Sequence, residues 1–376
     1  MAGGLPSDGE EARRATVKEI QVIGGGPAGL GLGIALRRRG IPVMIREAGT
    51  FPRHRVCGEV LHALSVETIL ECDLTGLLEE AYPLRSTAWF SCGREVLRGA
   101  FPREGWGLSR YRMDAALAER FGRLGGAIQT GQRIPGGGVD PEGVAWCAGR
   151  RADPDSNWLG LKAHFRGVEL RADVEMHLGR GGYVGLNRIE KGWVNVCGLF
   201  RRRAGIRAAR ENRLGDYLTL GGWEELAERL ERGEMREGSA AGVSAFRLGP
   251  VRPADGGQSG ILRLGDSRSM IGPFTGSGMA MAFDSAARCA PRLADYSEGR
   301  LSWTETVRAC NRSLSRRFRI REAAAGLAHP LLASKGGGGR LPRLGVLGRL
   351  GFRVLYEILF YPGGGGRHDD HVLVRS

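Results

Sequence analysis

The stretch Val22-Ile23-Gly24-Gly25-Gly26-Pro27-Ala28-Gly29 decides how the amino-terminal part of this 376-residue chain folds. The apolar run 20–23 predicts a strand, and the apolar residues of 30–36 recur at the spacing of one helix face. A glycine-rich turn between strand and helix brings backbone N–H groups and the positive end of the helix dipole to one point, which favours an anion. The stretch therefore predicts a turn that binds the pyrophosphate of a dinucleotide.

Three glycines of this stretch have separate roles in the prediction. Gly24 lets the chain turn tightly, Gly26 lets the backbone approach a pyrophosphate, and Gly29 lets the helix pack closely on the strand. Glu47 follows a second predicted strand, 41–46, and is placed to accept hydrogen bonds from a ribose, where an acid disfavours a 2′-phosphate. The alternative is a turn without a ligand, because the chain contains 62 glycines.

A second constellation lies more than two hundred residues further along the chain. The stretch 261–266 reads as a buried strand that ends in Asp266, and a carboxylate at the end of a parallel strand can accept hydrogen bonds from a polyol. Pro273-Phe274-Thr275-Gly276-Ser277-Gly278 then turns the chain into a predicted helix, 279–290, whose start offers further N–H donors. Two helix starts facing one elongated ligand suit a flavin dinucleotide better than a nicotinamide dinucleotide.

Together with Arg110 in Leu108-Ser109-Arg110-Tyr111, these motifs resemble the FAD-dependent oxidoreductases of the para-hydroxybenzoate hydroxylase fold, over about residues 16 to 330. This group includes aromatic monooxygenases and geranylgeranyl reductases. The resemblance implies an α/β protein: a Rossmann-type FAD-binding domain, an inserted antiparallel β-sheet substrate domain and a helical C-terminal region. It implies that Glu47 binds the adenosine ribose, that Asp266 binds the ribityl chain, and that 273–279 lies by the isoalloxazine. The residues expected to bind FAD are Gly24, Gly26, Pro27, Ala28, Gly29, Glu47, Arg55, Cys57, Arg110, Gly265, Asp266, Pro273, Gly276, Ser277, Gly278 and Met279.

Further stretches relate the chain to particular branches of this group. Phe51-Pro52-Arg53-His54-Arg55-Val56-Cys57-Gly58-Glu59-Val60-Leu61 resembles the Cys-Gly-Glu loop of the reductase and halogenase branch. The stretches 160–165 and 182–187 resemble bacterial members assigned as monooxygenase-like. The halogenase Trp-x-Trp-x-Ile-Pro signature is absent, and 183–188 replaces the reductase signature Tyr-x-Trp-x-Phe-Pro. The stretch 131–149 is shorter than the family's and lacks its second Asp-Gly pair, which leaves nicotinamide handling open.

The function implied by the resemblance is that of an NAD(P)H-dependent monooxygenase. NADPH or NADH would reduce the FAD, and a flavin C4a-hydroperoxide would hydroxylate or epoxidise a hydrophobic or aromatic small molecule. The first alternative is a reductase that passes hydride from FAD to an isolated double bond, as in prenyl reduction. The second is a non-catalytic flavin-binding or basic interaction protein, motivated by the shortened stretch 131–149 and by a net charge of +14.

The flavin would carry the chemistry, so no protein nucleophile is needed, and the catalytic residues are left open with Cys57, Lys162, His164 and Tyr183 as suspects. Cys57 could face the flavin or could be a small buried residue. Lys162 and His164 lie two apart on a predicted strand and so share one face, where they could bind a phenolate or carboxylate or form an ordinary solvated or hydrogen-bonded pair. Aromatic residues of this section could line a pocket or form core: Trp158, Phe165, Tyr183 and Trp193.

Composition argues against several other classes of protein. Only four of the 55 basic residues are lysines, and the arginines are scattered, so the net charge of +14 reflects composition and no nucleic-acid partner is expected. The seven cysteines include no CxxC pair, which predicts neither a disulfide framework nor a metal site and fits a reducing cytoplasm. No signal peptide and no apolar run long enough to span a membrane are expected.

The sequence also predicts an organisation into domains. Helical spacing is found in 61–80, 114–124, 214–232 and 301–328, and alternation predicts strands at 168–171, 174–177 and 193–196. The stretch 344–360 is amphipathic and either docks on the body of the protein or contacts a membrane surface peripherally, and the oligomeric state is left open. The predicted division is a disordered N-terminus (1–15), an FAD-binding domain (16–60, 96–158 and 247–295), a substrate domain (61–95 and 159–246), a helical region (296–335), and a glycine-rich linker, amphipathic segment and tail (336–376).

Overall fold

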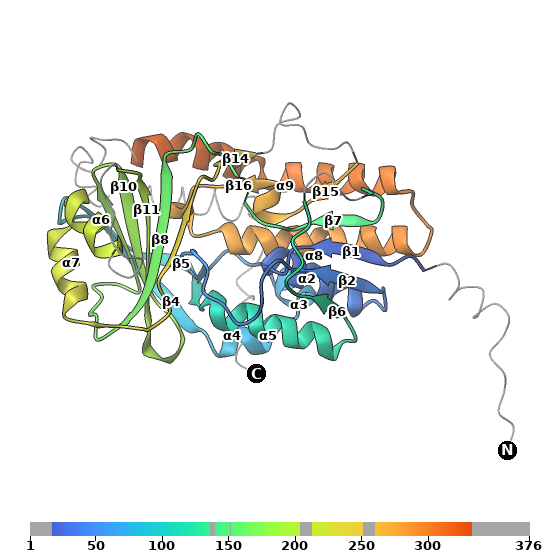
Figure 1. Cartoon of the computed structure of the whole chain (residues 1–376), viewed down its shortest axis with the longest axis horizontal. Helices are drawn as coiled ribbons and strands as arrows, with labels where there is room; N and C mark the ends of the chain where they lie inside the picture. The colour runs from blue at the N-terminus through green and yellow to red at the C-terminus, as the bar shows by residue number, and fades with distance from the viewer. Residues whose placement is uncertain (1–16, 136–139, 151, 204–212, 251–259, 333–376) are drawn as a thin grey trace, which may run out of the picture.

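The computed structural model describes residues 17–135, 140–150, 152–203, 213–250 and 260–332. The predictions for the chain ends, including the amphipathic stretch 344–360, lie outside these residues. Figure 1 shows one sheet with its helices at the right of the molecule and a second sheet at the left. The predicted α/β fold class is confirmed.

The first sheet is built from the strand-turn-helix unit predicted from the glycine-rich stretch. Its five strands run parallel in the order β15-β7-β1-β2-β6, which places the strand before the glycines in the centre. The carboxyl ends of β1 and β15 therefore open toward the same edge, where ligands bind in sheets of this kind. The strands are β1 (Ile20–Ile23), β2 (Val43–Arg46), β6 (Ala127–Gln129), β7 (Val144–Trp146) and β15 (Leu262–Arg263).

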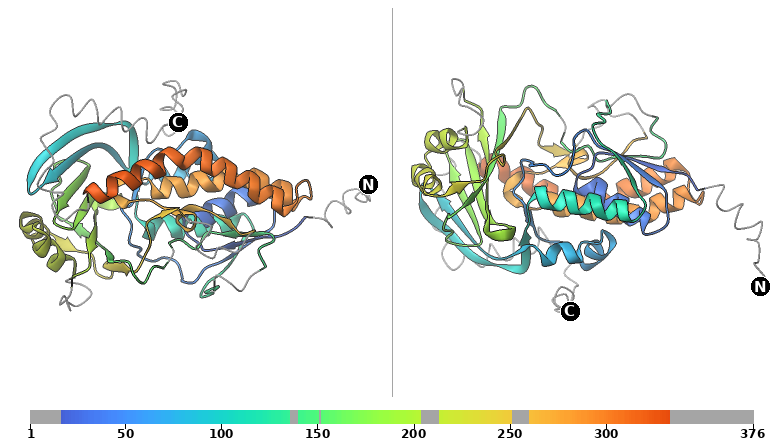
Figure 2. Two further views of the ribbon diagram at one scale, coloured as in Figure 1. Left: turned by 90° about the horizontal axis from the view of Figure 1, so that it is seen from above. Right: turned by 60° about the horizontal axis from the view of Figure 1, so that its bottom comes forward.

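Helices bury the apolar side chains of this sheet. Helix α2 (Pro27–Arg37) packs against α5 (Arg110–Arg123) and α8 (Gly278–Ser297), and α9 (Trp303–Leu332) packs along α8. Figure 2 shows α9 running beside α8 until its carboxyl end reaches the second sheet. Among the described residues, no helix is both long enough and apolar enough to cross a bilayer.

The second sheet is mostly antiparallel and has the order β12-β8-β11-β10-β9-β4-β5-β3, with β13 also paired to β8. One pairing, between β4 and β9, is parallel, because the β4–β5 hairpin enters the sheet from an earlier and separate part of the chain. Helices α6 (Arg213–Gly221) and α7 (Glu224–Glu231) cover the outer face (Figure 1). The strands are β3 (Val60–Leu61), β4 (Tyr82–Ser91), β5 (Arg94–Gly107), β8 (Trp158–Arg166), β9 (Val174–Gly179), β10 (Gly182–Arg188), β11 (Val194–Arg201), β12 (Glu234–Met235) and β13 (Ala241–Ser244).

Two local predictions are wrong. The single helix predicted over 61–80 is divided into α3 (Val66–Glu71) and α4 (Thr75–Glu79), because Asp73 between them has a left-handed φ of 54°. The strand predicted at 168–171 is an irregular connection between β8 and β9. This connection begins at Gly167, whose φ of 69° directs the chain out of the sheet.

The helical stretch predicted over 214–232 is divided into α6 and α7 at Gly222, whose φ is 83°. The other predicted elements are found with shifted ends, and their packing bears on the predicted domains. The predicted boundary at residue 96 falls inside β5, which belongs entirely to the second sheet. The apolar side chains of α3 and α4, predicted to be in the substrate domain, are part of the core beneath the first sheet. A short pair, β14 (Gly249–Pro250) with β16 (Ser269–Met270), and the 3-10 turns Glu190–Gly192, Gly265–Ser267 and Pro273–Thr275 complete the described elements.

Candidate functional site

In the turn after β1, close packing requires glycine at positions 24 and 29 but not at position 26. A Cβ added to Gly24, which has a φ of +107°, would lie 2.5 Å from the carbonyl oxygen of Cys147. A Cβ on Gly29 would lie 1.9 Å from the carbonyl oxygen of Gly24. A Cβ on Gly26 would meet nothing closer than the Arg110 guanidinium at 3.4 Å, so the protein leaves room beside the start of α2. That room is where a phosphate would lie against the helix N–H groups.

Glu47 lies next to this turn and is almost completely buried, at 4% exposed. Its carboxylate accepts hydrogen bonds from the backbone N–H groups of Gly25 (2.7 Å) and Gly49 (2.8 Å) and lies 2.8 Å from the Arg53 guanidinium. Burial by itself would raise the pKa of Glu47, but the contacts with Arg53, Gly49 and Gly25 outweigh burial and lower this pKa to about 2. Glu47 is therefore a charged acceptor, and Arg55 lies 3.6 Å from it.

The second motif meets the first at this edge of the sheet. A Cβ added to Gly265 would lie 3.0 Å from Cβ of Ala28, at the start of α2. Burial raises the pKa of Asp266 to about 6, although the charges of Arg110 and Arg150 act in the opposite direction. The charge of Arg110 thus acts on Asp266, while its guanidinium lies beside Gly26, which is far from Asp266 in the sequence.

Arg110 is fixed from both sides. Its guanidinium forms a two-pronged ion pair with Asp114, at 2.7 Å for each contact, and this pair raises the pKa of Arg110 against the effect of burial. Its backbone N–H donates to the carboxylate of Glu59 at 2.9 Å. Arg110, one of the residues expected to bind FAD, is therefore connected to the Cys57-Gly58-Glu59 loop.

The turn Pro273–Thr275 lies against the strand that follows this loop. His62, whose pKa burial lowers to about 4, is neutral and donates from Nε2 to the Thr275 carbonyl at 2.8 Å. Gly276, with a φ of +63°, passes so close to His62 that a Cβ would lie 3.2 Å from the ring. Ser277 then begins α8, so a second helix start faces the same edge of the first sheet.

These features fit FAD. The start of α2 has room for a pyrophosphate, and the start of α8 offers a second group of N–H donors. Asp266 makes no hydrogen bond to any residue that the structure describes, so its carboxylate is available to a polyol. The predicted cofactor residues of the two motifs are thus brought to one edge of the first sheet, and their roles toward FAD stay predictions.

Three ionisable side chains meet where the second sheet contacts the Cys57-Gly58-Glu59 loop. Glu59, Lys162 and His164 all have fully buried side chains. The Lys162 ammonium lies 2.5 Å from one Glu59 oxygen, and His164 Nε2 lies 2.6 Å from the other. Burial would raise the pKa of Glu59, but these two partners outweigh burial and lower it to about 2. An ionised carboxylate can only accept, so His164 carries its proton on Nε2, and its Nδ1 has no partner among the described residues.

The second sheet also holds the backbone of this loop. The Asn195 side chain donates to the carbonyls of Cys57 (3.1 Å) and Gly58 (2.9 Å), and Asn187 donates to that of Glu59 at 3.4 Å. These bonds keep Glu59 in a left-handed conformation with a φ of 55°. Burial raises the pKa of the Cys57 thiol, so Cys57 is a thiol at neutral pH.

The prediction that Lys162 and His164 share one face of a strand is confirmed, but their common partner, Glu59, was not predicted. The signal was present, because an acid in a loop predicted to lie by the cofactor is the natural partner for two basic groups on the substrate sheet. Of the alternatives for these two residues, a solvated pair is wrong, because both belong to a buried, hydrogen-bonded cluster of three residues.

An apolar cluster lies on the same face of the second sheet, beside the turn Pro273–Thr275. The Tyr183 ring packs edge-on against Phe274, with 6.0 Å between centroids, and Trp158 packs against His329 of α9 at 5.0 Å. Burial raises the pKa of Tyr183, so its phenol is neutral. Met176, Leu178, Leu199 and Phe246 complete the buried part of the cluster.

Two of the aromatic residues suspected of lining a pocket do not reach this cluster. Phe165 projects from the opposite face of β8 into the core beneath α6 and α7, because it is one residue out of phase with His164. Trp193 is partly exposed before β11, where the guanidinium of Arg166 lies 4.1 Å from its ring centroid. His329 was not predicted at all, because nothing in the helical pattern of α9 marks the residue that ends beside Tyr183.

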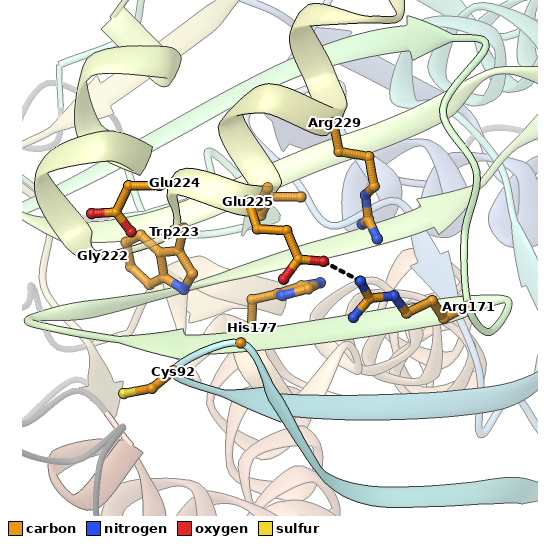
Figure 3. Close-up of a pocket in the computed structure, with 10 residues that line it drawn as sticks. Cys92, Arg171, His177, Gly222, Trp223, Glu224, Glu225 and Arg229 are labelled. Atoms are coloured by element: carbon orange, nitrogen blue, oxygen red, sulfur yellow. Dashed lines mark hydrogen bonds and ion pairs between the residues drawn. The ribbon is translucent and has the colours of Figure 1, made fainter.

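A cavity of about 230 Å³ lies elsewhere, between β9, the β4–β5 turn and the start of α7. Figure 3 shows His177 at its base and the ion pair between Arg171 and Glu225 across it. His177 and Arg229 both contact the buried carboxylate of Glu175, at 2.7 and 2.6 Å. No residue predicted to bind the cofactor lines this cavity, which is separate from the site described above.

Comparisons with known proteins agree with this fold. No family model and no curated protein sequence matches the chain. A solved structure of the flavin-dependent brominase Bmp2 has a TM-score of 0.65 at 17% identity and covers 90% of this chain and 98% of that one. PqsL of P. aeruginosa, in complex with 2-aminobenzoylacetate, has a TM-score of 0.66 at 16% identity and covers 86% and 98%. A geranylgeranyl bacteriochlorophyll reductase-like protein of Thermoplasma acidophilum has a TM-score of 0.65 at 18% identity and covers 92% and 96%.

These three proteins represent the monooxygenase, halogenase and reductase branches to which the sequence motifs were compared. At such low identities the similarity establishes the fold and not the reaction. The chain therefore has the predicted fold of the FAD-dependent oxidoreductases related to para-hydroxybenzoate hydroxylase.

Proposed function

We propose that this protein is an FAD-dependent oxidoreductase, and specifically an NAD(P)H-dependent monooxygenase that acts on a hydrophobic or aromatic small molecule. The observation that carries the proposal is the meeting of two distant motifs at one edge of the parallel sheet. Gly265 lies against Ala28, and Arg110 lies beside Gly26 while its charge acts on Asp266. A mononucleotide would need only one of these motifs.

Each motif would hold a different part of the cofactor. The N–H groups at the start of α2 would bind the pyrophosphate beside Gly26, and Glu47 would accept hydrogen bonds from the adenosine ribose. Asp266 would bind the ribityl chain, and the turn 273–278 would support the flavin ring from the start of α8. When bound, FAD would accept hydride from NADPH or NADH and activate dioxygen for transfer of one oxygen atom to the substrate.

The protein's own contribution would be to position an apolar substrate and exclude water. The cluster around Tyr183 and Phe274 supports this role because it is buried and lies directly beside the turn 273–278. Cys57 is not an activated nucleophile, since burial raises the pKa of its thiol. The described residues also contain no group of side chains that could hold a metal ion.

A reductase of isolated double bonds is the second candidate. The observation that favours it is the Cys57-Gly58-Glu59 loop, which is held against the substrate sheet by Asn195, so that a thiol lies in the position expected beside the flavin. Oxygen separates the two candidates, because a monooxygenase consumes one O₂ for each product formed and a reductase forms product without oxygen. A non-catalytic flavin-binding protein would consume neither NAD(P)H nor oxygen.

One experiment tests whether the protein is a flavoprotein that NAD(P)H reduces, and product formation with and without oxygen then separates the monooxygenase from the reductase. The purified protein is loaded with FAD and desalted, and its absorption is recorded. The bleaching of the flavin by NADPH and by NADH is then followed with and without oxygen. The monooxygenase predicts bound flavin, bleaching by one of the two reductants and recolouring when oxygen is admitted. A protein that remains colourless after FAD loading would overturn the proposal as a whole.

A further inference from the structure

One face of the second sheet contacts the Cys57-Gly58-Glu59 loop. The side chains on this face change from polar to apolar along the strands. Cross-strand partners point to the same face, so the register sorts the side chains into three rows. One end is polar, the middle is mixed and the other end is apolar. The rows are His164, Asn195 and Asn187; then Lys162, Cys197, Gly185 and Met176; then Leu199, Tyr183 and Leu178.

Lys162 stands in the middle row and is not saturated. Its side chain is fully buried, and its ammonium makes one hydrogen bond among the described residues, to Glu59 at 2.5 Å. An ammonium has three N–H donors, so two are left without a partner in a buried position. Unpaired buried donors are costly, and such a group normally meets an acceptor. Cys197 lies opposite Lys162, and Gly185 follows Cys197 in the same row. A Cβ on Gly185 would meet nothing closer than the Met176 side chain at 3.7 Å, so a methyl group there would be accommodated without a clash.

We propose that Lys162 binds an acidic oxygen of the substrate, a carboxylate or a phenolate, while the apolar body of the substrate lies over Met176 and Tyr183. This inference rests on the proposed substrate site and names the substrate class that this site accepts. Glu59 and His164 are positioning residues in it. Glu59 holds the ammonium in place, and His164 fixes the second oxygen of Glu59.

The test uses matched pairs of acid and amide, so that shape is constant and only the charge changes. The FAD-loaded protein is titrated calorimetrically with benzoate and benzamide, 2-naphthoate and 2-naphthamide, and decanoate and decanamide. At least one acid is expected to bind ten-fold or more tightly than its amide. Lys162→Gln is expected to abolish this preference, whereas Lys162→Arg and the exposed control Lys191→Gln should keep it. The proposal is overturned if no acid is preferred, or if Lys162→Gln retains the preference.

The comparison of each acid with its amide on the unmodified protein needs no folded Lys162 variant, and equal binding of acid and amide there would overturn the inference by itself. An acid preference without NAD(P)H-dependent oxygen use would retain this inference and reject the monooxygenase.

Discussion

Two glycines of the turn after β1, Gly29 and Gly26, allow the stability of the protein and its binding of FAD to be tested separately. Gly29 lies inside α2, where alanine ordinarily gains up to about 1 kcal/mol of helix propensity over glycine. Here the added Cβ would lie 1.9 Å from the Gly24 carbonyl oxygen, so helix and strand would have to separate by about 1.5 Å to restore normal contact. Overpacking against backbone costs about 1–3 kcal/mol or more. Gly29→Ala should therefore destabilise the protein even without FAD.

Gly26→Ala should have the opposite pattern. Gly26 has extended dihedral angles that alanine adopts readily, and the nearest atom to the added Cβ is the Arg110 guanidinium at 3.4 Å. The FAD-free variant should thus be as stable as the parent, to within about 0.5 kcal/mol. The methyl group would occupy the room beside the start of α2, so FAD retention should fall by ten-fold or more.

Urea unfolding of the FAD-free proteins and flavin absorbance after desalting measure the two effects separately. The parent protein, Gly26→Ala and Gly29→Ala are compared under the same conditions, with stabilities obtained by linear extrapolation. The reasoning is refuted if Gly29→Ala is as stable as the parent while Gly26→Ala binds FAD normally. That result would mean that the space beside Gly26 is not the phosphate site.

Two further predictions follow from buried carboxylates. Burial raises the pKa of Asp266 to about 6, so ionisation of this carboxyl opposes folding above that pH and has no effect below about pH 4. Asp266→Asn should therefore stabilise the FAD-free protein by about 2–3 kcal/mol at pH 7 and leave its stability unchanged at pH 4. The same substitution should weaken FAD retention. Unchanged FAD occupancy would remove Asp266 from the site. The pKa of Glu175 is lowered to about 2 by His177 and Arg229 against the effect of burial, so its contribution is complete above about pH 4.5 and is lost as the pH falls through 2. Glu175→Gln should lower the free energy of unfolding in urea by about 3 kcal/mol at pH 7 and by less at pH 3, while FAD binding stays normal. A loss of stability that does not depend on pH would contradict this account.

The sequence predicted best where a motif is both local and physically constrained. The run from Val22 to Gly29 contains its own strand, turn and helix start, and only glycine fits at two of its positions. The alternation of the substrate strands also fixed which residues share a face with Lys162, because the side-chain period of a strand is two. Both predictions depend on neighbours within a few residues.

Contacts between distant segments could not be predicted in the same way. Glu59 and Lys162 are 103 residues apart, and no periodicity connects them. The position of His329 depends on the length of α9, which carries its last turns beyond the first sheet to the second (Figure 2). The helix predicted over 61–80 was wrong for a local reason, since helical spacing of apolar residues does not reveal that Asp73 adopts a left-handed conformation.

The second sheet contacts two clusters of buried ionic side chains, one around Glu175 and one around Glu59, and their different burial distinguishes a structural role from a ligand-binding role. The partners of Glu175 line a cavity, and the Arg229 side chain is 17% exposed, so solvent screens part of the charge of this cluster. The Glu175 cluster can therefore have a purely structural role. Glu59 and Lys162 have no exposure, and the desolvation of such a pair is rarely repaid by the pair itself. A well-packed apolar pair could have joined the two sheets at lower cost. The unfavourable desolvation of the Glu59–Lys162 pair is therefore best explained by a ligand that accepts hydrogen bonds from the two remaining N–H donors of Lys162.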